Sequence, residues 1–252
     1  MHNTLRVATF NIHKGVTHFN TRLALQHQRN ALTHLNADIV FLQEVRETHA
    51  AHAKRFALWP EHGQMHFLSQ NLWPHAAYGK NAFYPSGHHG NAILSKFPLH
   101  TVANKNISAH PMEQRGMLHC QINVPHWSEP LHAFCLHLGL LAKWRHQQLN
   151  TIADYIEQHL PEQESPVIIA GDFNDWSTRA GDTLAQRLNM LEVFQHHTGS
   201  HARSFPAFFP MLKLDRIYVR GFDIQRANTH SNGGILNDSD HVILSSTLVK
   251  HV

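Results

Sequence analysis

The sequence contains little cysteine. Only Cys120 and Cys135 occur among its 252 residues, and each lies in an alternating apolar run. Two isolated cysteines form neither a disulfide framework nor a zinc-binding spacing, and thiols in such positions usually behave as small buried hydrophobic residues. We therefore expect a protein of a reducing compartment, namely the cytoplasm.

Long hydrophobic runs are also absent. No apolar stretch reaches the roughly 18–20 residues that a membrane-spanning helix needs. Residues 1–6 contain no apolar stretch followed by a small-residue cleavage site, so we expect no signal peptide and no stable membrane insertion. The chain has no repeat, linker or low-complexity segment. We expect a single domain over residues 1–252 and a monomer.

Charged residues are few, at 15% of the chain against 42% hydrophobic residues, which is typical of a globular protein. The net charge is +3 with histidine neutral, and 26 histidines would add positive charge near pH 6. This balance suits an anionic substrate. The lysines and arginines are nevertheless scattered, without the basic block that many nucleic-acid-binding proteins carry.

Short apolar segments outnumber helical ones. Strand patterns occur at residues 5–12, 39–42, 75–84, 91–95, 116–124, 131–138, 167–170, 214–219, 222–227 and 242–249. Helical spacing occurs at 23–35, 141–160 and 183–188, a polar helix and loop are expected from 43 to 57, and a turn at 87–90. This pattern predicts sheets packed on each other with helices outside.

Acidic and amide residues stand at the ends of several predicted strands. Asn11 and Glu44 follow the first two strands, Asp172 and Asn174 follow the strand at 167–170, and Asp240 precedes the last strand. Rigid strands aim such loop residues at one point. Oxygen ligands of this kind suit Mg²⁺ or Mn²⁺ better than zinc.

Two histidines and one more carboxylate mark further strand ends. His137 closes the strand at 131–138, His241 follows Asp240, and Asp215 opens the strand at 214–219. A carboxylate that orients an imidazole, together with a metal that neutralises phosphate charge, provides the groups needed to hydrolyse a phosphoester.

Eight short motifs occur in order along the chain. They are Thr9-Phe10-Asn11-Ile12, Leu42-Gln43-Glu44, Gly90-Asn91-Ala92-Ile93-Leu94-Ser95, Arg115-Gly116-Met117-Leu118, His137-Leu138, Gly171-Asp172-Phe173-Asn174, Leu214-Asp215-Arg216-Ile217 and Ser239-Asp240-His241. Together they resemble the endonuclease/exonuclease/phosphatase superfamily, over residues 5–248, and residues 11–15 and 87–91 most resemble its bacterial YbhP-like branch. The resemblance implies the DNase I-like fold: an α/β, four-layer sandwich of two mixed sheets face to face, with helices outside and the site at one edge.

The resemblance also implies a metal site for Mg²⁺ or Mn²⁺. Glu44 resembles the main metal ligand, with Asn11 beside it, and Asp240 resembles the remaining acidic residue of the metal and water site. His13 departs from the pattern, because several relatives carry an acidic residue there. An imidazole at that position weakens the case for a second metal.

Catalytic roles follow from the same resemblance. Asp172 and Asn174 resemble the pair that positions the attacking water and the scissile phosphate, and His137 resembles the histidine that donates to a phosphate oxygen. His241 resembles the catalytic histidine, and Asp215 the carboxylate that orients it. Either Asp172, or His241 with Asp215, would activate water, and the sequence leaves both open.

Three further residues are candidates for contacting the substrate, namely Asn91, Arg115 and Trp176. Only one of the neighbouring His88 and His89 can face the site, since adjacent residues on a strand point to opposite faces. The aromatic, proline-punctuated loop at 205–210 is either a packed loop or a wall for the leaving group.

Structural roles compete with these catalytic ones. Asp172 could cap a turn, and Glu44 could be a solvated loop residue. Asp215 and Arg216 could form a surface ion pair, and His241 could be a structural histidine. The ordered motifs favour catalysis in each case.

We expect a phosphoester substrate, with nucleic acid slightly preferred over phospholipid because of the positive charge and the missing signal peptide. A phospholipid or inositol-phosphate phosphodiesterase or phosphatase is the alternative. A non-enzymatic binding relative is less favoured, because every catalytic position is filled.

Overall fold

The computed structural model describes residues 3–17, 21–70, 72–160, 165–176, 181–230 and 238–251. Two six-stranded sheets form its centre. The first contains, in spatial order, β11 (Phe222–His230), β12 (Ile243–Lys250), β1 (Thr4–Asn11), β2 (Ile39–His49), β4 (Gly87–Ser95) and β3 (His75–Tyr84). The second contains β5 (Leu99–Asn106), β6 (Gly116–Ile122), β7 (Leu131–His137), β8 (Val167–Asp172), β10 (Asp215–Arg220) and β9 (Leu191–Glu192).

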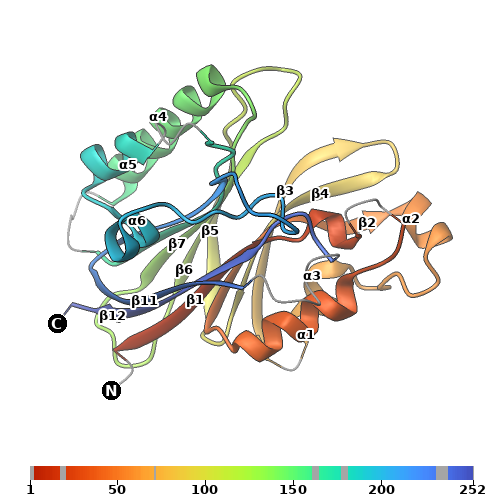
Figure 1. Ribbon diagram of the computed structural model, residues 1–252, viewed down its shortest axis with the longest axis horizontal. Helices are drawn as coiled ribbons and strands as arrows, with labels where there is room; N and C mark the ends of the chain where they lie inside the picture. Colours follow the sequence, from red (N-terminus) through yellow and green to blue (C-terminus); the bar gives the residue numbers. More distant parts are fainter. Residues whose placement is uncertain are drawn as a thin grey trace.

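Both sheets are mixed. β1 pairs in parallel with β2, and β7 pairs in parallel with β8, while the other neighbours are antiparallel. The first and last strands, β1 and β12, lie side by side (Figure 1). The expected sandwich of two mixed sheets is therefore confirmed.

Helices lie on the outside of the sandwich. On the first sheet they are α1 (Leu25–Leu35) and α3 (Gln64–Ser69), and on the opposite side of the molecule α4 (Ala142–His159) and α5 (Gly181–Leu188) (Figure 1). Two further short helices are α2 (Ala50–Arg55) and α6 (Val193–Thr198), and η1 (His13–Gly15) is a single 3₁₀ turn. In the described part of the chain, no helix is long and apolar enough to cross a membrane.

Alternation along β1 shows how the layers form. Leu5 and Val7 lie in the core cluster between the two sheets, whereas Ala8 and Phe10 belong to the cluster under α1. A strand whose two faces are both covered is apolar nearly throughout, which explains the continuous apolar segments in the sequence. The predicted helix and loop from 43 to 57 is wrong for residues 43–49, where β2 continues to His49, whereas the helix is confirmed in α2.

The predicted turn at 87–90 is also wrong. Those residues begin β4, and the turn lies at residues 85–86. The glycines serve close approach between strands instead. A Cβ on Gly90 would lie 1.9 Å from the carbonyl oxygen of Gly79 on β3. The sequence analysis also missed β5, whose largely exposed and polar residues give no buried-strand signal.

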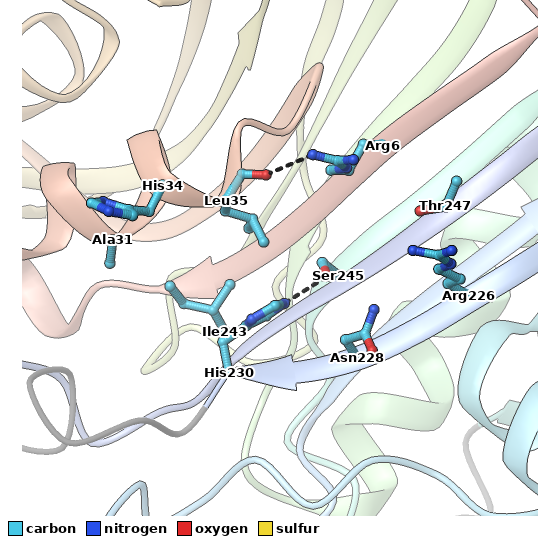
Figure 2. Close-up of a pocket in the computed structure, with 10 residues that line it drawn as sticks. All are labelled: Arg6, Ala31, His34, Leu35, Arg226, Asn228, His230, Ile243, Ser245 and Thr247. Atoms are coloured by element: carbon cyan, nitrogen blue, oxygen red, sulfur yellow. Dashed lines mark hydrogen bonds between the residues drawn. The ribbon is translucent and has the colours of Figure 1, made fainter.

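The outer face of β11 and β12 is not covered by α1. A groove of about 480 Å³ remains between them, and Figure 2 shows Arg6, Arg226 and His230 along it. None of the described residues that line this groove carries a carboxylate. It therefore offers neither an acidic metal ligand nor a carboxylate base.

Candidate active site

The predicted site residues meet where the two sheets come together at one end. Asn11 ends β1 of the first sheet, and Asp172 ends β8 of the second. The Asn11 side-chain amide donates to Oδ2 of Asp172 over 3.0 Å, although 161 positions separate the two residues. Asp172 is also the register partner of His137 on β7 and of Asp215 on β10.

Two imidazoles approach the same oxygen of Asp172. Nε2 of His137 lies 3.5 Å from Oδ2, and Nε2 of His241 lies 3.7 Å from it. The backbone N–H of Asn174 donates to the other oxygen, Oδ1, over 2.9 Å. Asp172 is 2% exposed. It is therefore the buried centre of the constellation rather than only a turn cap.

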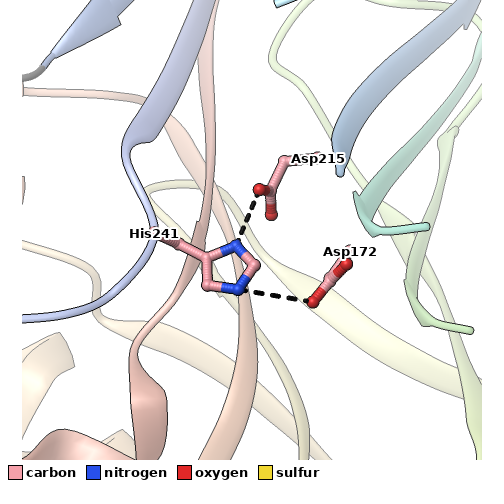
Figure 3. Close-up of side chains that lie close together, drawn as sticks. All are labelled: Asp172, Asp215 and His241. Carbon is pink, nitrogen blue, oxygen red and sulfur yellow. Dashed lines mark hydrogen bonds and ion pairs between the residues drawn. The ribbon is translucent and has the colours of Figure 1, made fainter. Parts of the chain in front are cut away.

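His241 is held between two carboxylates, as Figure 3 shows. Its Nδ1 lies 2.8 Å from Oδ2 of Asp215, while Nε2 points toward Asp172. Burial alone would lower the pKa of this imidazole, but Asp215 and Asp172 outweigh burial and raise the pKa to about 10. His241 is therefore protonated at neutral pH.

The alternative of a surface ion pair between Asp215 and Arg216 is wrong, because both residues are only 1% exposed. Arg216 donates to the backbone carbonyls of Lys213, Asp215 and Asp175. The carboxylate of Asp215 therefore contacts His241 and not Arg216.

Burial and neighbouring charges shift the pKa values of Asp172 and His137 in opposite directions. Burial raises the pKa of Asp172 to about 6, and Asp215 adds to that effect, although His241 opposes it. For His137, burial and then the positive charge of Arg115 place the pKa well below its ordinary value. One imidazole is therefore charged and the other neutral at neutral pH.

The predicted metal ligands lie beside this centre. Glu44 stands in a bulge of β2 with a φ of 58°. Its buried Oε2 accepts no hydrogen bond from the described residues, although the Lys14 ammonium lies within ion-pair distance. Burial raises its pKa, but Lys14 and His89 outweigh that effect and hold it below the usual value. Burial also raises the pKa of Asp240, but the hydrogen bond from His13 and the charge of His241 together outweigh burial and lower it.

The sequence analysis missed Lys14. Its Nζ lies 3.4 Å from Oε2 of Glu44, and Nδ1 of His13 lies 3.1 Å from Oδ1 of Asp240. These two side chains project from η1, where His13, Lys14 and Gly15 have φ values of 47°, 60° and 71°. Gly15 was the available signal, since glycine favours this left-handed backbone.

A cleft beside Glu44 holds two of the predicted substrate residues. It is lined by Glu44, His89, Asn91, Arg115 and His137, among others. Nδ2 of Asn91 donates to the carbonyl oxygens of Gly116 and Cys135 on the second sheet, so this amide ties the two sheets together.

The structure places only one of the other three candidates, His88, His89 and Trp176, at this cleft. His89 faces the cleft, whereas His88 points elsewhere and lies 2.9 Å from the hydroxyl of Tyr78. Trp176 is 50% exposed, and the guanidinium of Arg145 lies 4.9 Å from the centre of its ring. Trp176 therefore stands outside the cleft.

Among the described residues, one group of carboxylates and imidazoles is close enough to hold a metal directly. It consists of Asp172, Asp215 and His241, whose ligand atoms lie within 4.8 Å of one another. Both ring nitrogens of His241 face carboxylates, Nδ1 toward Asp215 and Nε2 toward Asp172, so these three residues also form a buried triad. Glu44, Asp240 and Asn11, which the sequence predicts as metal ligands, lie outside this group.

Residues 8–241 match the model of the Endonuclease/Exonuclease/phosphatase family, and the chain belongs to that family. Its members are generally phosphoester hydrolases that use divalent metals. The chain is 40% identical over 245 residues to the uncharacterized protein YbhP of Escherichia coli, covering 97% of this chain and 96% of that protein.

Solved structures show the same fold. An endonuclease/exonuclease/phosphatase from Beutenbergia cavernae superposes with a TM-score of 0.78 at 19% identity, covering 98% of this chain and 72% of the other. A mannosyl-6-phosphatase from Bacteroides thetaiotaomicron gives a TM-score of 0.71 at 16% identity, covering 97% and 99%.

Proposed function

We propose that this protein is a Mg²⁺- or Mn²⁺-dependent phosphoester hydrolase of the phosphodiesterase type, in which water attacks phosphorus. The observation that carries the proposal is the convergence of Asn11, His137 and His241 on one oxygen of Asp172, with Asp215 behind His241. Such a set can position water, move a proton and stabilise phosphoryl charge.

The residues beside this centre fit a hard divalent cation. Glu44 and Asp240 have lowered pKa values and are ionised at neutral pH, and Asn11 adds an amide oxygen. Carboxylate and amide oxygens are what Mg²⁺ prefers. When bound there, the cation would neutralise phosphate charge and polarise the phosphoryl oxygens.

The protonation states suggest which residue is the base. His241 is protonated and cannot accept a proton, but it can donate a hydrogen bond to a phosphoryl oxygen. Asp172, with a pKa of about 6, is ionised yet basic enough to take a proton from water. We therefore assign the base to Asp172. Asp215 orients His241, and His137 with Arg115 would face the phosphate.

The test is hydrolysis of bis-p-nitrophenyl phosphate by the purified protein. A chelator should abolish turnover, and Mg²⁺ or Mn²⁺ should restore it. E44Q should lower kcat/KM about 10²- to 10⁴-fold, because it removes a charged ligand while keeping the side-chain shape. E61Q changes an exposed glutamate and serves as the control. Full turnover in excess chelator would contradict the proposal.

The substrate class is a separate matter. The net charge of +3 gives only general support to a nucleic-acid substrate. The phosphatase among the structural neighbours is named for a sugar phosphate, which supports a small phosphoester equally well. Exposed apolar side chains on loops that follow site residues favour the phospholipid alternative.

A further inference from the structure

The loop between α6 and β10 holds apolar side chains in solvent. Phe208 and Phe209 are 68% and 63% exposed, and Met211 and Leu212 are 54% and 38% exposed. Backbone hydrogen bonds brace this loop: the N–H of Ser204 donates to the carbonyl of Leu212, and that of Ala207 to the carbonyl of Asp240, each over 2.8 Å. The exposed apolar side chains therefore project from a loop that backbone hydrogen bonds hold in place.

Two neighbouring loops do the same. Leu140 and Leu141, 56% and 54% exposed, follow β7 shortly after His137. Trp176, 50% exposed, follows β8 shortly after Asp172. Each of these loops thus leads directly away from a residue of the candidate active site.

Two buried arginines join the three loops. Arg145 is 2% exposed, donates to the carbonyl of Leu140 over 2.5 Å, and lies 3.5 Å from the carboxylate of Asp175. Arg216 donates to the carbonyl of Asp175 over 3.1 Å and to that of Lys213. The seven exposed side chains therefore lie on three neighbouring loops, and we call them together the apolar rim.

The apolar rim concentrates exposed hydrophobic surface. Seven of the twelve large hydrophobic side chains exposed in the described residues belong to it; the other five are Leu58, Phe83, Val102, Met112 and Leu191. Scattered exposed hydrophobic residues are ordinary on soluble proteins, whereas a contiguous group marks an interaction site.

Charge and side-chain type indicate what the apolar rim contacts. The accessible charged residues on or directly beside these loops are basic: Arg203 and Lys213 precede β10, and Lys143 lies in the first turn of α4. The single acid in the described parts of the loops, Asp175, is 2% exposed and paired with Arg145. Four of the seven rim side chains are aliphatic. Bases of single-stranded nucleic acid stack on aromatic rings, so aliphatic residues would add little to such a surface. Aromatic and aliphatic residues with basic neighbours suit an anionic lipid interface.

We propose that the apolar rim docks this protein on the surface of an anionic lipid layer and brings a lipid phosphoester to the active site. The proposal rests on the proposed hydrolase function. Docking would bury Phe208 and Phe209 at the boundary between headgroups and acyl chains, while Lys213 and Arg203 meet anionic headgroups. The three loops would then surround the phosphate that approaches Asp172.

Vesicle flotation tests this docking without depending on catalysis. The probe is a vesicle of phosphatidylglycerol and phosphatidylcholine, and the full-length protein carries D172N so that no lipid is consumed. We expect binding to these vesicles, and F208S/F209S should weaken it at least about tenfold. L58S/V102S removes two exposed hydrophobic side chains outside the rim and should leave binding unchanged. Circular dichroism confirms that each variant is folded.

The outcomes separate the two proposals. Wild-type turnover of bis-p-nitrophenyl phosphate tests the hydrolase function by itself. If the wild type hydrolyses this soluble diester but does not bind vesicles, or binds them equally well without the two phenylalanines, docking is overturned and the hydrolase stands. If the vesicles are bound but no phosphoester is cleaved, the hydrolase fails. If F208S/F209S instead loses affinity for a single-stranded oligonucleotide in fluorescence anisotropy, the rim is a base-stacking surface.

Discussion

At the scale of single residues, the decisive feature is the contact between His241 and Asp215. Both are almost fully buried, and Nδ1 of His241 lies 2.8 Å from the carboxylate. An anion in this position fixes the tautomer and keeps the imidazole charged. Under the proposed function, His241 donates to a phosphoryl oxygen only while Asp215 keeps its imidazole charged and oriented. We therefore expect the two residues to act as a unit.

The expected result is non-additive loss of activity. H241A should lower kcat/KM by about 10²- to 10⁴-fold, D215N alone should cost less, and D215N added to H241A should cost almost nothing further. The measurement is a double-mutant cycle with the soluble diester. The exposed pair of His251 and Asp223, 3.1 Å apart, provides the matched control, and D223N should not change the rate. Strictly additive losses would mean that His241 and Asp215 work independently.

At the scale of secondary-structure elements, β8 depends on a glycine directly before the central carboxylate. Gly171 has a φ of 151°, and a Cβ there would lie 2.0 Å from the carbonyl oxygen of Leu136 on β7. A side chain would push apart the two strands that carry Asp172 and His137. The motif glycine therefore sets the spacing of the site.

G171A should lower the free energy of unfolding by at least about 3 kcal/mol, because strain and a backbone clash add together. Urea unfolding measures this. Gly199 also has a positive φ, 78°, but a Cβ there meets nothing within 4 Å, so G199A should cost only about 1 kcal/mol. Equal losses in the two variants would show that the clash is relieved by local movement.

A second feature of the elements is a buried histidine pair beneath α4. Nε2 of His119 lies 3.0 Å from Nδ1 of His132, and Nδ1 of His119 lies 3.1 Å from the hydroxyl of Tyr155. Burial lowers the pKa of His119 to about 3 and that of His132 to about 4. Both are therefore neutral in the folded protein.

This pair should make the fold sensitive to acid. The unfolded chain binds a proton on each histidine at about pH 6.5, whereas the folded chain does so only near pH 3–4, so stability falls as the pH falls through this window. Between pH 7 and pH 5 each histidine should remove on the order of 2 kcal/mol from the free energy of unfolding. H132Q should flatten this pH dependence in urea titrations, and the exposed H146Q should not. An unchanged slope in H132Q would contradict the assignment.

At the scale of the whole molecule, the two sheets bring negative charges together at one end. Glu44 on β2 and Asp240 before β12 belong to the first sheet, while Asp172 and Asp215 belong to the second. Like charges gathered in a folded protein repel one another, and a bound cation relieves that repulsion. A ligand that binds only the folded state stabilises it by mass action.

Mg²⁺ or Mn²⁺ should therefore raise the melting temperature, independently of any substrate. At a concentration 100 times the Kd, the stabilisation should be about 2.7 kcal/mol. Differential scanning fluorimetry should show this shift in the wild type and a much smaller one in E44Q, with E61Q behaving like the wild type. A shift of equal size in E44Q would place the cation elsewhere.

The sequence by itself determined which residues stand at the ends of the strands. Apolar runs of period two or of continuous burial are local signals, and they located Asn11, His137 and Asp172 at the tips of β1, β7 and β8. The order of the short motifs was enough to predict the two-sheet sandwich. Polar segments such as the second half of β2 gave no such signal, because pairing with β4, not hydrophobicity, makes them strands.

Only the tertiary structure decided which of these residues touch. Asn11 and Asp172 meet across the two sheets, and Asp215 turns to His241 while Arg216 turns to backbone carbonyls. Such choices depend on strand register and on the packing of one sheet against the other, which join residues far apart in the chain. The exposure of Phe208 was equally invisible in the sequence, because an apolar residue in a loop is buried or displayed according to what the rest of the fold places beside it.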